Sequence, residues 1–348
     1  MDAQEGRTKS GTESGIKSGK DRRHHAADRI SLKGALAGEA TDVHIFPSAS
    51  STAEDAPLSA ATARVRIGGV LGPLTAVEAD VDGELLALLN NPPKPDFSTS
   101  LPSGRRLRVA VRTVCSAAAQ EIFIRVLPET IPPVFDKLAH LLPEIAAMTP
   151  GLVLVSGITG SGKSTLLASV AMRHLELGAH VVTVEDPVEY LLRSKTTSGY
   201  ASQREVGLDV PDFASGVKMS LREDPDTIIV GEIRDRETAL ATLTAAETGH
   251  SVFATVHAGG CFGTVDRFLS LVGGSEFEAM RLAGTYLCGI HVTSRSVEEE
   301  RNIFVERTYE IFRSNDAART HIRDRSAHRL WQARLGTSEK DWKLTIRS

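Results

Sequence analysis

The sequence predicts an α/β protein: a phosphate-binding domain built on a mostly parallel sheet, preceded by a smaller α+β domain. Three observations carry this prediction. Residues 152–167, LVLVSGITGSGKSTLL, read as a buried strand, a glycine-rich turn and the start of a helix. Apolar strand-like runs alternate with helical patterns through the next hundred or so residues, the order typical of a parallel sheet. The 348 residues are also enough for two domains, each with its own core.

The glycine-rich turn fits the phosphate-loop pattern G-x-x-x-x-G-K-[ST]. Glycines let the backbone curl around a phosphate with its N–H groups pointing inward, and the following helix adds its positive N-terminal dipole. Lys163 suits the β- and γ-phosphates of a nucleotide, and the Ser164 hydroxyl suits Mg²⁺. The predicted nucleotide-binding residues are Gly157, Thr159, Gly160, Ser161, Gly162, Lys163, Ser164 and Thr165.

Composition excludes several other classes of protein. A net charge of −4 argues against a protein whose main task is to grip nucleic acid, and we expect no sequence-specific nucleic-acid binding. The three cysteines lie far apart, which predicts neither a zinc site nor a disulfide framework. No apolar run is long enough to cross a bilayer and the N-terminus is polar. We therefore expect a cytoplasmic protein that contacts membrane only through partners.

The N-terminal third divides into a tail and a small domain. Residues 1–39 are rich in small and charged residues without aromatics, which predicts a disordered tail. Residues 40–128 read as an α+β domain with a hairpin turn at Gly68-Gly69 and a helix over Ala76–Asn90. Its predicted strands are Thr41–Phe46, Ala63–Ile67, Leu107–Val114 and Glu121–Leu127.

A proline-rich linker over 129–150 leads into the nucleotide domain, which we place at 151–295. Its predicted strands are Leu152–Val155, His180–Val184, Thr227–Val230 and Ser251–Val256, and its predicted helices are Lys163–Leu177, Pro211–Arg222 and Arg236–Thr248. Residues 296–348 are expected to be a C-terminal extension with strands in Asn302–Phe312, to which the sequence assigns no role.

Acidic residues and a histidine follow the predicted strands where a ligand of a parallel sheet binds. Glu185 follows the second strand, Glu232 comes just after the third, and His257 follows the fourth. Phosphoryl transfer to water requires one carboxylate near Mg²⁺ and another that orients or deprotonates the water. Glu232 suits the metal role and Glu185 the water role, although the pattern alone permits the reverse assignment.

Arginines gather on the second strand pair of the small domain: Arg106, Arg108, Arg112 and Arg125. Their alternation favours solvent-facing charge on a strand. The alternative is a set of guanidinium groups presented to a phosphate across an interface.

Four further strings resemble the secretion and pilus ATPases of type II and type IV systems over roughly residues 40–295. VVTVEDPVEY (181–190) looks like the family's Asp box, and SQREVG (202–207) resembles the element after it. Residues 221–250 look like the Walker B region, and SVFATVHA (251–258) completes a His box whose histidines are His250 and His257.

The resemblance implies a PAS-like N-terminal domain, a RecA-like core and a homohexameric ring that binds ATP and Mg²⁺ between the two domains of each subunit. It implies Glu185 as general base, Ser164 and Glu232 near Mg²⁺, His250 in the nucleotide site and His257 as a reporter of the γ-phosphate. It also favours Arg108, Arg112 and Arg125 as candidate arginine fingers.

The segments ATDVHI and RRLRVAVRTVC look most like the conjugative and Dot/Icm-type members. We therefore predict a motor ATPase of a type IV secretion or conjugation apparatus, associated with inner-membrane platform components. A pilus retraction motor is the first alternative. An ATP-binding assembly factor without turnover remains open, because Ala258-Gly259-Gly260 departs from the family pattern after His257. A small-molecule phosphotransferase would leave the Asp and His boxes unexplained.

Overall fold

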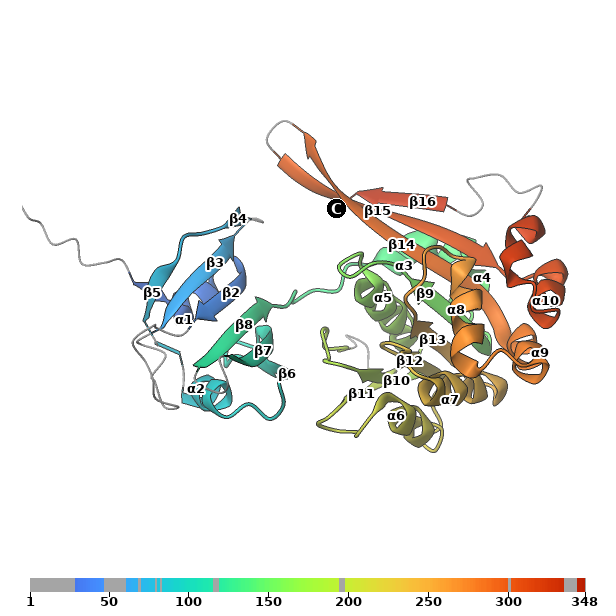
Figure 1. Ribbon diagram of the computed structural model, residues 1–348, viewed down its shortest axis with the longest axis horizontal. Helices are drawn as coiled ribbons and strands as arrows, with labels where there is room; N and C mark the ends of the chain where they lie inside the picture. Colours follow the sequence, from blue (N-terminus) through green and yellow to red (C-terminus); the bar gives the residue numbers. More distant parts are fainter. Residues whose placement is uncertain are drawn as a thin grey trace, which may run out of the picture.

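The computed structural model shows two domains joined by a short connection (Figure 1). It describes residues 29–46, 61–67, 70–78, 80–81, 83–114, 119–193, 198–299, 302–334 and 343–347. Among these residues, no helix has both the length and the hydropathy that a membrane span requires.

The N-terminal domain is a mixed sheet with the strand order β1-β5-β3-β2-β8-β7-β6, with β4 paired to β3. Its elements are β1 (Ile30–Ser31), α1 (Leu32–Ala37), β2 (Ala40–Phe46), β3 (Thr62–Ile67), β4 (Val70–Leu71), β5 (Thr75–Glu78), α2 (Gly83–Asn90), β6 (Asp96–Ser100), β7 (Arg106–Val114) and β8 (Ala119–Val126). On β7, Leu107, Val109 and Val111 point into the core while the arginines at alternate positions face outward. The period of two thus gives this sheet an apolar face and a basic face.

Two expectations for this domain are wrong. The fold begins near Ile30 rather than at residue 40, because α1 buries Leu32 and Leu36 in the domain core. The helix expected over Ala76–Asn90 is divided into β5 and α2, since its first three positions, Ala76 to Glu78, pair with β1 and β3. The turn expected at Gly68-Gly69 lies outside the described residues.

The C-terminal domain is built on the strand order β11-β10-β12-β13-β9-β14-β15-β16. Its elements are α3 (Val134–Leu138), η2 (Ala139–Leu141), α4 (Pro143–Ala146), β9 (Gly151–Ser156), α5 (Lys163–Glu176), β10 (His180–Glu185), β11 (Tyr200–Glu205), α6 (Phe213–Ser220), β12 (Thr227–Val230), α7 (Arg236–Glu247), β13 (Ser251–Thr255), α8 (Gly263–Val272), α9 (Glu276–Thr285), β14 (Tyr286–Glu299), β15 (Asn302–Arg313), α10 (Asp316–Arg323), η3 (Ala327–Arg334) and β16 (Lys343–Arg347). In this order, neighbouring strands pair in parallel from β11 across β10, β12, β13 and β9 to β14. The pairs β14–β15 and β15–β16 are antiparallel.

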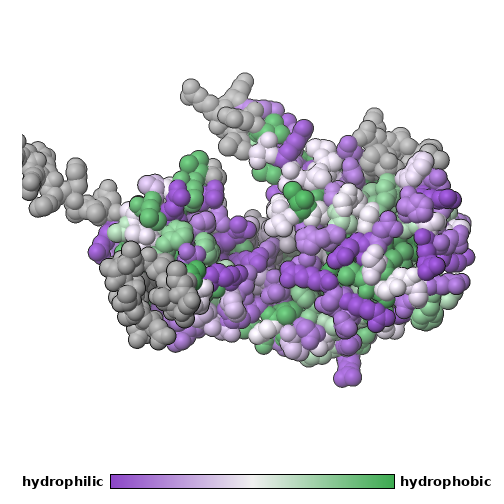
Figure 2. All heavy atoms as spheres, viewed as in Figure 1, coloured by the Kyte–Doolittle hydropathy of each residue, from purple (hydrophilic) through white to green (hydrophobic). Residues whose placement is uncertain are grey.

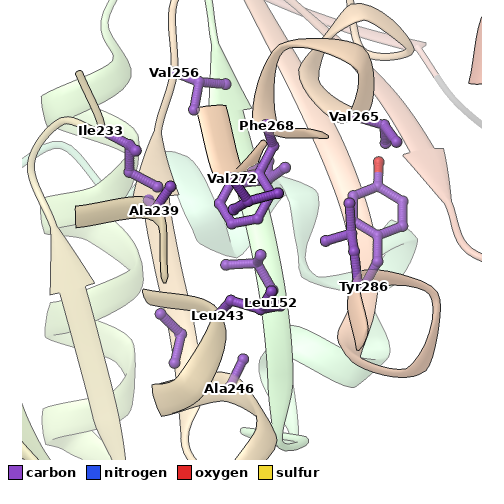
Figure 3. Close-up of a cluster of buried hydrophobic side chains, with 14 of the residues drawn as sticks. Leu152, Ile233, Ala239, Leu243, Ala246, Val256, Val265, Phe268, Val272 and Tyr286 are labelled. Atoms are coloured by element: carbon purple, nitrogen blue, oxygen red, sulfur yellow. The ribbon is translucent and has the colours of Figure 1, made fainter. Parts of the chain in front are cut away.

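Hydrophobic side chains cover both faces of the central strands. One cluster joins Leu152 of β9 to Leu243 of α7, Phe268 of α8 and Tyr286 at the start of β14 (Figure 3). The other packs α3 and α5 against the opposite face. Because β9, β12 and β13 are buried on both faces, their sequences are continuous apolar runs rather than alternating patterns.

Two predicted boundaries of this domain need correction. Much of the stretch expected as a linker belongs to the core, because Phe135, Leu138 and Ile145 are buried beside α5. At the other end, Tyr309, Ile322 and Leu330 are fully buried. The segment after residue 295, expected as a separate extension, therefore continues the nucleotide domain through η3.

A two-stranded arm rises from the sheet. β14 pairs with β9 only over Tyr286–His291, while β15 follows β14 to Glu299. The outer part of this hairpin therefore extends past the end of β9, and the space-filling view shows a hollow between the arm and the N-terminal domain (Figure 2).

Candidate functional site

The phosphate loop lies between β9 and α5, as predicted. Gly162 is the residue before α5 and has φ of +104°, in the left-handed region that only glycine adopts at little cost. Lys163 Nζ donates to the carbonyls of Gly157 at 2.8 Å and Ile158 at 3.0 Å, so its ammonium lies over the loop. Thr159 and Gly160 form the exposed tip of the loop and Ser161 is buried beneath it.

Glu185 ends β10 beside the first turn of α5. Its Oε1 accepts hydrogen bonds from Thr183 Oγ1 at 2.7 Å and Gln203 Nε2 at 3.3 Å. Burial raises the pKa of Glu185 to about 7, although these hydrogen bonds act in the opposite direction. A carboxyl with this pKa can accept a proton near neutral pH.

A small cavity of about 40 Å³ joins this carboxyl to the phosphate loop. Its lining includes Ser164, Thr183, Glu185, Gln203 and Gly231. A buried water needs a cavity with roughly 10–15 Å³ or more of space for its centre, and two to four polar partners. The cavity therefore has room and polar partners for water between the Ser164 position and the Glu185 carboxyl.

Glu232 and His257 meet at the same edge of the sheet. His257 Nε2 lies 2.8 Å from Glu232 Oε1, and Arg234 Nη2 lies 2.5 Å from Glu232 Oε2. Burial lowers the pKa of Lys163, and the nearby Glu232 and Glu189 carboxylates raise it again. Glu185, Glu232, His257 and Lys163, expected together from the ends of four strands, are thus gathered at one edge.

The candidate arginines do not share one environment. Arg108 Nη1 lies 3.3 Å from Glu189 Oε1, across the boundary between the domains, and Arg108 also pairs with Asp96. Arg112 donates to the carbonyl of Pro95 and Arg125 pairs with Asp42, both within the N-terminal domain. In this arrangement, Arg108 is the candidate that reaches the nucleotide domain.

His250 is separated from the phosphate loop of its own chain. It precedes β13, and its carbonyl accepts from Gly151 N at the start of β9, whereas the loop follows the end of β9. Its ring contacts Thr248 and the Ala245 carbonyl. We therefore do not assign His250 to the nucleotide site of its own subunit: the two histidines of the box lie at opposite ends of one strand.

The structure adds residues to which the sequence assigned no role. Glu189 lies in the segment that resembles the Asp box, and Arg234 lies in the segment that resembles the Walker B region. The charge of these two side chains is the signal that could have identified them. His291 Nδ1 lies 2.8 Å from Ser156 Oγ at the base of the loop. Arg307 of β15 packs against Gly162, where an added Cβ would lie 2.9 Å from Nε. No local pattern identifies these last two, because β14 and β15 reach the loop through sheet pairing.

A larger cavity of about 560 Å³ opens beside α5, between the domains. Tyr190 lines it and its hydroxyl lies 3.0 Å from Thr165 Oγ1, so the cavity begins next to the last residue of the predicted loop. Its lining also includes Arg106, Met172 and Arg193. The volume lies in the range of small-molecule sites.

Within the part of the chain that the structure describes, no group of three or more His, Cys, Asp and Glu side chains is arranged to hold a metal ion. The donors near the loop are the Ser164 hydroxyl and the Glu232 carboxylate. This donor set fits Mg²⁺, which keeps several waters and is bound through one or two protein groups plus substrate phosphates.

Comparison with known proteins shows the family of this chain. Residues 29–329 match the model of the family described as type II/IV secretion system protein. The uncharacterized protein YggR of Escherichia coli is 38% identical over 258 residues, which cover 72% of this chain and 76% of YggR. A twitching motility protein of Neisseria gonorrhoeae is 43% identical, and the match covers only 49% of that protein. The type IV pilus retraction ATPase PilT of Pseudomonas aeruginosa is 38% identical, and the match covers only 54% of it.

Two solved structures share the fold. The Legionella pneumophila ATPase DotB has a TM-score of 0.66 and 25% identity, covering 87% of this chain and 89% of DotB. The pilus retraction motor PilT with bound ADP has a TM-score of 0.67 and 28% identity, covering 90% and 92%. The predicted α/β architecture with a RecA-like core is confirmed. The chain belongs to the type II/IV secretion system protein family.

Proposed function

We propose that this protein hydrolyses ATP to ADP and phosphate and that it does so as a motor subunit. The observation that carries the proposal is the half-buried Glu185 carboxyl, which shares a water-sized cavity with Ser164 at the mouth of the phosphate loop. A carboxylate in that position can take a proton from a water held between itself and the γ-phosphate. The membership of ATPases such as DotB and PilT in the same fold supports the reaction class.

The nucleotide is proposed to lie along the loop toward the larger cavity. Backbone N–H groups of the loop and Lys163 hold the β- and γ-phosphates. Thr165 lies beside Tyr190, so the α-phosphate end would direct the nucleoside into the cavity of about 560 Å³. ADP bound to PilT supports nucleotide use by this fold.

Ser164 and Glu232 would hold Mg²⁺, directly or through water. When bound with the nucleotide, Mg²⁺ neutralises charge on the β- and γ-phosphates. His257, paired with Glu232, would then lie where the γ-phosphate leaves, and we propose that it responds to that change. Arg108 would approach the same charge from the N-terminal domain after releasing Glu189.

We further propose that six copies form a ring that drives a type IV secretion or conjugation apparatus, with the ring docked on inner-membrane components. The segments ATDVHI and RRLRVAVRTVC, which look most like the conjugative and Dot/Icm-type members, support that branch, and the ATPase DotB shares the fold over 87% of this chain. Pilus retraction is a second candidate, because a twitching motility protein of Neisseria gonorrhoeae is 43% identical over 189 residues and PilT shares the fold. Expression in a strain lacking its retraction ATPase separates them: restored twitching supports retraction.

Steady-state phosphate release, measured beside mass by size-exclusion chromatography with light scattering, tests the central proposal. We expect turnover from a particle of about six subunits, abolished by Lys163→Ala. Nucleotide binding without phosphate release would support an assembly factor. Phosphate transferred to an acceptor instead of water would support a phosphotransferase.

A further inference from the structure

We infer that Lys94 and Glu205 form a latch through which docking of the N-terminal domain positions the Glu185 carboxyl. The inference rests on the hydrolytic function proposed above and adds a positioning role for residues outside the phosphate loop. Figure 1 shows β6 and β7 on the side of the N-terminal domain that faces β11, where these contacts occur.

Glu205 is a buried carboxylate held by both domains. Its side chain is 5% exposed. From the N-terminal domain it accepts hydrogen bonds from Ser98 Oγ at 2.6 Å and Ser98 N at 3.3 Å, and Lys94 Nζ lies 3.2 Å away. From the nucleotide domain it accepts from Val188 N at 3.0 Å, in the loop that follows Glu185. One carboxylate therefore ties β6 to the loop next to the proposed base.

Lys94 of the N-terminal domain also contacts the residues that follow β10 and β11. Its side chain is 14% exposed, and Nζ contacts Asp186 Oδ1 at 3.1 Å and the Val206 carbonyl at 2.5 Å. Asp186 directly follows β10 and Val206 directly follows β11. The ammonium thus bridges the ends of two neighbouring strands. Removal of one member of a buried ion pair leaves the other charge uncompensated, so the latch should open rather than loosen.

The register of the sheet connects this latch to Glu185. β10 and β11 are parallel, with Glu185 opposite Glu205 and Thr183 opposite Gln203. Gln203 Nε2 donates to Glu185 Oε1 and, at 2.8 Å, to the Tyr190 carbonyl, while its Oε1 accepts from Leu192 N. β11 therefore carries the residue that holds the N-terminal domain and, two positions earlier, a residue that holds the Glu185 carboxyl. Docking of the N-terminal domain fixes both.

A latch that only holds the domains together and a latch that positions Glu185 differ in their kinetic effects. Loss of a purely structural contact lowers stability or nucleotide affinity. Loss of a positioning contact lowers kcat with little change in KM, because the base is misplaced while the phosphate loop is intact.

Lys94→Met tests the inference, with Lys94→Arg as the conservative variant. Arg64→Met is the matched control, since Arg64 donates to the Gly72 carbonyl within the N-terminal domain. We expect Lys94→Met to lower kcat about a hundredfold with KM for ATP nearly unchanged, Lys94→Arg to recover most of the loss, and Arg64→Met to resemble wild type. Unchanged kcat in Lys94→Met, or a loss that Lys94→Arg does not recover, would overturn the latch.

Hydrogen exchange of residues 186–193 in the full chain provides a readout that needs no hydrolysis. The Val188 and Leu192 amides are bonded to Glu205 and Gln203, so Lys94→Met and Ser98→Ala should both accelerate their exchange. If the wild-type protein bound ATP without turnover, the proposed function would fail, and the exchange experiment would still test the latch. Amide protection equal to that of wild type in both variants would refute the latch.

Discussion

His257 Nε2 lies 2.8 Å from Glu232 Oε1, and so joins the ends of β12 and β13 at the mouth of the phosphate loop. The His257 side chain is 57% exposed whereas that of Glu232 is 17% exposed. The exposed imidazole can therefore turn toward a ligand, while the carboxylate stays in place. This pair connects the proposed metal site to the group that we propose responds to the γ-phosphate.

Replacement of His257 by Ala should lower turnover more than nucleotide affinity, because the substitution frees Glu232 without altering the loop. We expect a loss of kcat of about tenfold or more, as for other partners of metal-site carboxylates. ATP titration and phosphate release measure the two effects. The matched control is His250→Ala, at the far end of β13; an equal loss there would contradict the assigned geometry.

Glu185→Gln should abolish hydrolysis and spare binding. General bases contribute about 10² to 10⁴ in rate, and the amide keeps the shape of the side chain but cannot take the proton. Fluorescent nucleotide binding and phosphate release separate the two properties. Glu237→Gln, on an exposed position of α7, is the control. Turnover at the wild-type rate in Glu185→Gln would exclude Glu185 as the base.

The raised pKa of Glu185, about 7 against a value of 4.5 for an unperturbed carboxyl, predicts two effects of pH. Since the base must be deprotonated, kcat should rise with pH through about 7. Between the two pKa values the folded protein holds the proton more tightly than the unfolded chain, so the contribution of Glu185 to stability falls as pH rises through this window.

Glu185→Gln lacks this ionisation and should gain stability over wild type as the buffer moves from about pH 5 to about pH 8, by up to about 3 kcal/mol. Urea unfolding of both proteins at the two pH values measures it. A difference that does not change with pH would show that Glu185 is ionised in the folded protein throughout.

Arg108→Gln should reduce hydrolysis far more than Arg112→Gln or Arg125→Gln. Arginine fingers contribute roughly 10³ to 10⁵ in rate, and Arg108 is the candidate whose guanidinium contacts the nucleotide domain through Glu189. Phosphate release from the three variants, prepared in parallel, ranks them. A dominant loss in Arg125→Gln would instead place the finger in a neighbouring subunit.

Gly162→Ala should weaken nucleotide binding and also destabilise the fold. Gly162 has φ of +104° and packs against Arg307, so an added methyl is both strained and crowded. Gly249→Ala is the matched control, because Gly249 has φ of +99° with open space around its Cβ position. We expect each variant to lose about 1 kcal/mol from backbone strain. Only Gly162→Ala should lose affinity for ATP; equal affinities would show that the Arg307 contact is unimportant.

Local sequence determined the elements whose signals are continuous in the chain. β9, the phosphate loop and α5 lie where the pattern predicted them, because an apolar strand, a glycine turn and a helix start follow one another without interruption. The domain boundaries were predicted wrongly because they lack such a continuous signal. Leu32, Phe135 and Leu330 lie in polar or proline-rich stretches of the sequence, and their burial depends on partners far away in sequence.

Parallel pairing also explains why the site was partly predictable. Because strand ends meet at one edge of a parallel sheet, the sequence alone determined that Glu185, Glu232 and His257 would lie near Lys163. Only the tertiary structure decided that Arg106 and Arg108 reach the nucleotide domain whereas Arg112 and Arg125 do not. It also decided that His250 lies at the opposite edge, and that Arg307 and Lys94 approach the loop region. Those contacts join residues at least 81 positions apart in the sequence. Their geometry is fixed by sheet order and domain docking, which no local pattern encodes.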